Sequence, residues 1–255
     1  MLQPAAAAGS AHSTVRLIVK DQPERDGRLL AGVEIKLRPG WKTYWRTPGE
    51  SGIPPSFDWS NSDNVEAAEV RWPAPQRFND HGETIFGYRD EVIFPVAVRP
   101  KRAGEPVRLS LALFYAVCRD VCVPVRAEVT VKTDQTQADP ADIVALERFE
   151  AKVPAGKADG LDIRSVSVRR TGRAVALDIA VAAADSATPV DIFVESEQAG
   201  LGFGAPTLAR DEQDLHVYEV PVDGAMADGA PNRLGRVTLT LVQGEKALTR
   251  TVHLD

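Results

Sequence analysis

The sequence predicts an all-β protein built from two β-sandwich domains joined by a short helical linker. Three observations support this prediction. Apolar and polar residues alternate with a period of two in many short segments, glycine and proline separate these segments, and one segment, residues 139–154, shows helical spacing instead. Alternation of this kind is typical of strands with one buried face, and short strands divided by such turns are typical of a sandwich.

The first domain is expected at residues 13–135, after a disordered N-terminus at residues 1–12. Strands are predicted at residues 13–20, 28–38, 56–60, 65–72 and 91–99, followed by two strands within residues 109–131. Residues 41–59 combine five aromatic residues with three prolines, which predicts an irregular, rigid loop that ends in the short strand. Residues 76–90 are predicted to form a further loop.

The only two cysteines, Cys118 and Cys122, interrupt the alternating segment at residues 109–131. On one continuous strand they would lie about 13 Å apart, whereas a disulfide needs Cα atoms within about 7 Å. The β-branched and aromatic content argues against a helix. We therefore expect a hairpin whose loop is Arg119–Asp120–Val121, with the cysteines facing each other on its wetter face. A disulfide across so small a loop stabilises the fold by only about 2 kcal/mol. This suits a reversible redox switch better than a structural cross-link.

Composition excludes several classes of function. The chain has 255 residues and a formal net charge of −6, which fits one or two globular domains and gives no electrostatic reason to bind nucleic acid or an anionic membrane. No apolar run reaches 18 residues, so no transmembrane helix is predicted. The N-terminus lacks a basic segment followed by an apolar one, so we expect no signal peptide and a mature or engineered start. Two cysteines in a turn suit a redox pair in an oxidising compartment.

The strand pattern resumes after the helical segment. Asp139–Pro140 has the form of a helix N-cap followed by a first-turn proline, and apolar residues recur at helical spacing up to Pro154. A short helix is therefore predicted inside a linker at residues 136–159. Seven strands are then predicted at residues 161–169, 173–181, 190–195, 202–208, 215–220, 237–242 and 247–254. The second domain, residues 160–255, has the size of an immunoglobulin-like module and contains no motif that indicates chemistry.

Four motifs of the first domain occur in the order found in a known family. They are GWKTYWRTPGESGIPPSFDWS at residues 40–60, WPAP at 72–75, FGYRDEVIFPV at 86–96 and FYAVCRDVCVP at 114–124. Over residues 13–133 the chain resembles the N-terminal periplasmic (alpha) domain of the ScsB proteins, suppressor-of-copper-sensitivity relatives of the disulfide reductase DsbD. The second sandwich resembles the additional domain of ScsB-type proteins. The resemblance implies two immunoglobulin-like β-sandwich domains, the first of them redox-active.

The function implied by this resemblance is that of a periplasmic thiol:disulfide oxidoreductase, a protein-disulfide reductase domain without a bound cofactor. In the family, the domain receives electrons from a transmembrane section through a thioredoxin-like domain and passes them to soluble thioredoxin-fold proteins. A ScsC-like protein is the expected partner, and the chain would be a monomeric, soluble fragment of an inner-membrane protein. Three residues separate the cysteines here, as in the ScsB branch, whereas five separate them in DsbD.

The two cysteines receive different roles by the same resemblance. Cys122 would form the mixed disulfide with the partner, and Cys118 would resolve it. Between them, Arg119 would favour a thiolate and Asp120 would oppose it, so the sequence leaves their balance open.

An aromatic cap loop shields the cysteines of DsbD from stray oxidation, and the matching segment here is residues 81–88. We expect Phe86, next to Ile85, to cover the pair, with Tyr44 and Trp45 lining the same pocket. Other aromatic residues of this region are assigned to packing.

Other functions of the cysteine pair stay open. A CxxxC pair can bind Cu(I) through two thiolates, as in copper-delivery proteins of the Sco type. Those proteins carry CxxxCP on a thioredoxin-like fold, whereas Val123 follows Cys122 here. The name of the ScsB family refers to a copper phenotype, which disulfide repair can explain without any bound metal. No metal site is therefore assigned. The pair could also be an inert structural bridge, and the second domain a structural or docking module.

Overall fold

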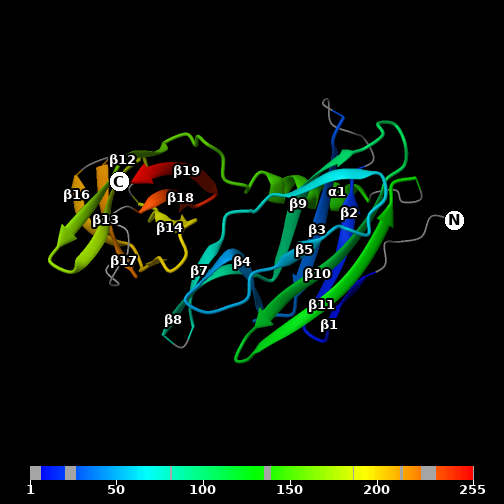
Figure 1. Ribbon diagram of the computed structural model, residues 1–255, viewed down its shortest axis with the longest axis horizontal. Coiled ribbons are helices and arrows are strands. Elements are labelled where there is room, and N and C mark those ends of the chain that lie inside the picture. The colour runs from blue at the N-terminus through cyan, green and yellow to red at the C-terminus, as the bar shows by residue number, and fades with distance from the viewer. Residues whose placement is uncertain are drawn as a thin grey trace. The chain divides into compact units, whose positions relative to one another are not determined.

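The computed structural model describes residues 7–20, 27–80, 82–134, 139–185, 187–212, 215–224 and 234–254. The chain divides into two compact units, Met1–Val153 and Pro154–Asp255. Figure 1 labels most of their strands and the single described helix. Nearly all of the regular secondary structure described in both units is antiparallel sheet. The prediction of an all-β protein with sandwich folds is therefore confirmed.

The first unit contains two antiparallel sheets. One has the order β1-β2-β3-β9-β6, with bounds Ala8–Ser10, Ser13–Val19, Leu29–Leu37, Glu91–Pro100 and Val65–Val70. The other has the order β11-β10-β4-β8-β7, with bounds Cys122–Lys132, Arg108–Cys118, Lys42–Gly49, Glu83–Arg89 and Gln76–Asp80, and β5 (Ser56–Asp58) also pairs with β10. Phe94 of β9 makes edge-to-face contacts with Phe57 of β5 and Tyr88 of β8, each at 5.4 Å between ring centroids. The core of the first unit therefore lies between these two sheets.

Two segments predicted as loops are strands in the structure. Residues 42–49 form β4, whose first half pairs with both β10 and β8. Pro48 does not prevent this pairing, because it lies within the irregular stretch between Tyr44 and Gly49, beyond the regular ladder. Residues 76–90 contain the β7–β8 hairpin, which turns at the left-handed Gly82. In both segments the prolines and glycines were misleading as signs of loops, because pairing with neighbouring strands holds the backbone extended.

The N-terminus also differs from the prediction of disorder. Residues 1–6 lie outside the described part of the chain, but Ala8–Ser10 forms the edge strand β1, paired with β2. His12 then stacks on Trp41, with ring centroids 3.9 Å apart. Asp26–Gly27 stands between two predicted strands and has the form of a turn; Asp26 lies outside the described residues, and Gly27 adopts a left-handed conformation.

The predicted helix is present but belongs to the first unit. α1 (Pro140–Glu150) begins as expected, with the Asp139 carboxylate accepting a hydrogen bond from the Ala141 amide at 2.8 Å. Leu146 is fully buried and approaches β3 at Gly32, where a Cβ atom would lie 2.8 Å from the leucine Cδ1. The helix therefore packs on the first sheet, which corrects its assignment to a linker at residues 136–159.

Four ion pairs join α1 to strands and loops of the first unit. They are Arg16–Asp142, Arg71–Glu150, Lys20–Glu147 and Arg148–Glu91, at 2.6, 2.7, 2.8 and 2.9 Å. Arg16 also donates to Glu34, a buried carboxylate of β3. The hydrogen bonds from Arg16 hold the pKa of Asp142 below its usual value. A carboxyl group with a lowered pKa stabilises the fold above its unfolded pKa, and this contribution is lost as pH falls through the folded pKa.

Asp142→Asn should therefore destabilise the first unit in a pH-dependent way. We expect the free energy of unfolding at pH 7 to fall by on the order of 1 kcal/mol, and the difference from the parent protein to shrink as pH falls below about 4. Urea unfolding at several pH values measures this difference. Asp134→Asn, which removes an exposed carboxylate, is the control for the loss of one charge. A difference that stays constant down to pH 3 would contradict the role of Asp142 in this ion pair.

The second unit is built from two further antiparallel sheets. One has the order β12-β13-β17-β15, with bounds Leu161–Thr171, Ala174–Ala183, Leu215–Asp223 and Gly202–Phe203, and β16 (Thr207–Glu212) also pairs with β17. The other has the order β14-β18-β19, with bounds Asp191–Ser196, Gly235–Gln243 and Lys246–Leu254. The strand predicted at residues 202–208 is divided into β15 and β16, because Pro206 between them has no amide hydrogen for a ladder.

Candidate active site

Cys118 and Cys122 lie at the tip of the β10–β11 hairpin and are joined by a disulfide. The hairpin register pairs them directly, with Cα atoms 4.2 Å apart, and leaves residues 119–121 as the loop. The two strands lie side by side in Figure 1. The predicted hairpin and its register are confirmed. Val121, between the cysteines, is 70% exposed.

The two sulfur-bearing residues differ in exposure. Cys118 is only 4% exposed, whereas Cys122 is exposed. The cause is their position in the sheet: β10 is an inner strand with β4 on its other side, where Cys118 pairs with Lys42, while β11 is the edge strand. The face predicted to be wetter is indeed exposed along β11 but is covered at Cys118. A protein that approaches this disulfide therefore meets Cys122 first.

A small apolar cluster covers Cys118 on the outer face of the sheet. Its buried members are Tyr44, Ile85, Ala116 and Cys118, and Ile53 and Phe78 pack against them. The side chains come from β4, β7, β8 and β10 and from the segment after β4. Cys118 thus lies beneath a cluster of its own, apart from the core between the sheets.

Two of the predicted pocket residues lie on the other face. Trp45 follows Tyr44 and Phe86 follows Ile85, and successive side chains of a strand point to opposite faces. Phe86 shares its face with Tyr88, whose ring contacts Phe94 of the other sheet. The structure therefore places Ile85 and Tyr44 beside Cys118, and it corrects the expectation that Phe86 and Trp45 lie there. His81, the first residue of the predicted cap segment, lies outside the described residues.

The Tyr44 hydroxyl oxygen lies 2.9 Å from the Cys122 sulfur. In the disulfide, the sulfur carries no hydrogen, so the hydroxyl is the donor. After reduction, the same hydroxyl can donate to a Cys122 thiolate, and hydrogen bonds to ionised acceptors are the stronger kind. Tyr44 is therefore well placed to stabilise the Cys122 sulfur as an anion.

Comparison with known proteins identifies the first unit. Residues 14–134 match the family described as the N-terminal domain of the thiol:disulfide interchange protein DsbD. This part of the chain belongs to the DsbD N-terminal family. Residues 152–255 match a family described as a domain of unknown function, DUF8393. A search of curated proteins found no match.

A solved structure shows the same fold over nearly the whole chain. The N-terminal periplasmic domain of ScsB from Proteus mirabilis is similar to this chain, with a TM-score of 0.75, 22% sequence identity, and coverage of 98% of this chain and 100% of that one. The similarity covers both units. The family match over residues 14–134 confirms the resemblance inferred from the four motifs and places the cysteine pair in a thiol-disulfide exchange module.

Phe78 and Ile53 belong to the apolar cluster that covers Cys118, but the sequence analysis did not predict them there. Phe78 lies opposite Ile85 in the β7–β8 hairpin and so shares its face. The signal was available: reading residues 76–90 as a hairpin turning near Gly82 places Phe78 across from Ile85. The guanidinium of Arg89 and the ammonium of Lys42 lie 4.9 and 5.9 Å from the Phe78 ring centroid.

The charged residues of the hairpin loop contact each other. The Arg119 guanidinium donates to the Asp120 carboxylate at 2.9 Å, and both side chains are mostly exposed. Their opposite effects on a nearby thiolate therefore largely offset each other.

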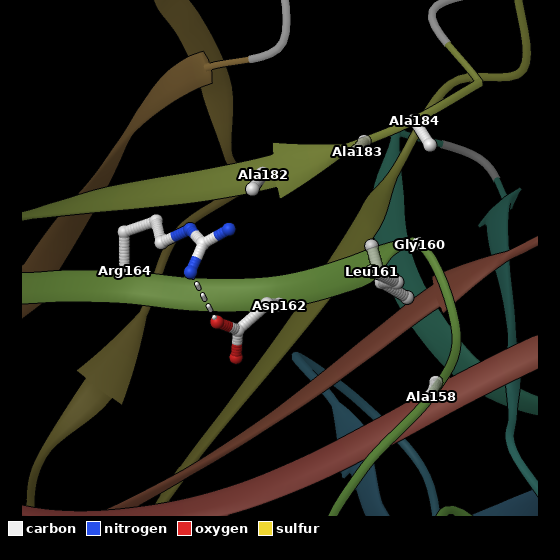
Figure 2. A pocket seen from close by; sticks show the side chains of 8 residues that line it. All are labelled: Ala158, Gly160, Leu161, Asp162, Arg164, Ala182, Ala183 and Ala184. Atoms are coloured by element: carbon white, nitrogen blue, oxygen red, sulfur yellow. Dashed lines mark ion pairs between the residues drawn. The ribbon is translucent and has the colours of Figure 1, made fainter.

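The second unit contains a shallow depression of about 260 Å³ near the start of β12. Figure 2 shows its lining, which is mostly small and apolar: Ala158, Gly160, Leu161, Asp162, Arg164, Ala182, Ala183 and Ala184. Its charged members, Asp162 and Arg164, form an ion pair at 3.1 Å. In the described parts of the chain, no group of three or more His, Cys, Asp or Glu side chains could hold a metal ion, and no helix is long and apolar enough to cross a membrane.

Proposed function

We propose that this DsbD N-terminal domain reduces the disulfides of thioredoxin-fold proteins in the periplasm through reversible oxidation of Cys118 and Cys122. The observation that carries the proposal is the unequal exposure of the two cysteines at the hairpin tip, with Cys122 exposed and Cys118 covered. A purely structural bridge has no need of one accessible sulfur, whereas exchange requires it.

The exchange proceeds by two in-line attacks on sulfur. In the reduced domain, the Cys122 thiolate attacks one sulfur of the partner's disulfide, and the partner's other sulfur leaves as a thiolate. The product is a mixed disulfide between Cys122 and the partner. Cys118 then attacks the Cys122 sulfur, which re-forms the internal disulfide and releases the partner with both sulfurs reduced. Two electrons pass to the partner, and no bound cofactor takes part.

The residues around the pair support different roles for the two cysteines. The Tyr44 hydroxyl, 2.9 Å from the Cys122 sulfur, stabilises the attacking thiolate. Ile85, Phe78 and Ile53 cover Cys118, so small oxidants in solution have little access to the resolving thiol. A partner with an exposed redox cysteine docks at the hairpin tip, where Val121 presents an apolar side chain.

The DsbD family and the ScsB fold support a proposal for the partners. We propose that the domain is reduced by a thioredoxin-like domain linked to a transmembrane section, and that it reduces a ScsC-like periplasmic protein. The second unit, Pro154–Asp255, would then position the redox domain or help to dock the partner.

A redox titration tests the function. The Cys118–Cys122 pair should show a midpoint potential above about −300 mV, the range of labile, exchanging disulfides. The measurement equilibrates the protein in glutathione or dithiothreitol buffers and counts alkylated thiols by mass. A midpoint well below that range, or thiols that react only in denaturant, would identify the pair as a structural bridge.

The same protein tests the Cu(I) alternative. A stoichiometric Cu(I) complex of the reduced domain that survives competition by a strong chelator would favour copper binding over exchange. If the redox midpoint lies in the exchanging range and no such complex forms, the reductase function stands.

A further inference from the structure

The segment that follows β4 lies directly on the ring of Tyr44. At Gly52 the backbone has a φ of +132°, and a Cβ atom there would lie 2.4 Å from Tyr44 Cε1 and 2.5 Å from Cδ1. Real Cβ atoms are not found at such distances, so any side chain at position 52 must displace the ring or the backbone. Glycine also avoids the strain that an L-residue would carry at this φ. We call residues 50–53 the Gly52 strap.

The strap is anchored on the cluster that covers Cys118. Ile53, its last residue, packs against the buried group that contains Tyr44, Ile85 and Cys118. At its other end, the Glu50 amide donates to the Thr84 carbonyl of β8 at 2.9 Å. The strap is therefore held at both ends, and Gly52 between them lies against the Cδ1 and Cε1 atoms of the Tyr44 ring.

The position of this ring decides where its hydroxyl lies. Tyr44 is fully buried, and its hydroxyl oxygen lies 2.9 Å from the sulfur of Cys122. The hydroxyl is at the far end of the ring, so a small tilt of the ring moves it by about an ångström, and hydrogen bonds weaken steeply over such a distance.

We propose that Gly52 is a positioning residue for thiol-disulfide exchange: by letting the strap approach the Tyr44 ring this closely, it holds the tyrosine hydroxyl beside the Cys122 sulfur. The inference deepens the proposed function and rests on it. Gly52 acts through Tyr44, and Tyr44 acts on the Cys122 thiolate, which is the attacking species.

The test measures the reactivity of Cys122 without any partner protein. In a Cys118→Ser background, Cys122 is the only thiol, and its rate of alkylation by iodoacetamide as a function of pH reports the thiolate fraction. Gly52→Ala should slow alkylation at neutral pH by roughly tenfold and move the pH profile to higher pH, as loss of one hydrogen bond to a charged group predicts. Tyr44→Phe should do the same.

The double variant distinguishes positioning from a general disturbance. If Gly52 acts through the hydroxyl, adding Gly52→Ala to Tyr44→Phe should produce no further slowing. Gly104→Ala is the matched control, because Gly104 also has a positive φ, +78°, but has no atom within 4 Å of its Cβ position. It should leave the pH profile unchanged.

Three results would overturn the inference. They are an effect of Gly52→Ala no larger than that of Gly104→Ala, a full effect of Gly52→Ala in the Tyr44→Phe background, or no effect of Tyr44→Phe. If circular dichroism shows that Gly52→Ala does not fold, Ile53→Ala, which loosens the strap at a half-buried residue, takes its place with the same expectations. The proposed function is tested separately: it fails if the redox midpoint potential of the parent protein lies well below about −300 mV.

Discussion

Cys118→Ser should convert the domain from an exchanger into a trap for its partners. Cys122 stays exposed at the hairpin tip, so it still attacks a partner disulfide and forms a mixed disulfide. The resolving thiol is then missing, and the mixed disulfide persists until an external thiol cleaves it. We expect its lifetime to increase by roughly a hundredfold or more, the scale of losing an intramolecular reactant.

The measurement is the yield of mixed disulfide with an oxidised thioredoxin-fold protein, followed by non-reducing electrophoresis and mass spectrometry. Cys122→Ser is the matched control. It keeps one cysteine, Cys118, but that residue is 4% exposed and lies beneath the cluster of Tyr44 and Ile85, so it should trap almost no partner. Equal trapping by the two variants would refute the assignment of Cys122 as the attacking residue.

Leu146→Ala should strongly destabilise the first unit. Leu146 is 0% exposed and lies where α1 approaches β3 at Gly32. Removing a buried leucine side chain costs about 3 kcal/mol through lost burial and the cavity that remains. A helix that merely linked two domains would show no such cost.

Tryptophan fluorescence during urea unfolding isolates this effect, because all four tryptophans lie in the first unit, at positions 41, 45, 59 and 72. Val144→Ala on the same helix is the control, since Val144 is 67% exposed and should change stability by less than about 0.5 kcal/mol. If Leu146→Ala lowered the free energy of unfolding by less than about 1 kcal/mol, α1 would be only a linker.

Local patterns in the sequence predicted much of what the structure contains. Period-2 alternation located the strands of the hairpin, and the impossibility of bridging four residues along one strand predicted the register that pairs Cys118 with Cys122. The Asp139–Pro140 pair located the start of α1. Errors arose where prolines or glycines were taken as signs of loops, at β4 and at the β7–β8 hairpin.

The sequence by itself determined the strands, the cysteine hairpin and the family, because each depends on residues that are close along the chain. Only the tertiary structure decided which cysteine is exposed, because that depends on β4 lying beside β10 rather than beside β11. It also decided that Tyr44, Ile85 and Phe78 surround the disulfide while Phe86 faces the core. Alternation in a sequence separates the two faces of a strand, but strand pairing and the packing of distant segments decide what each face contacts.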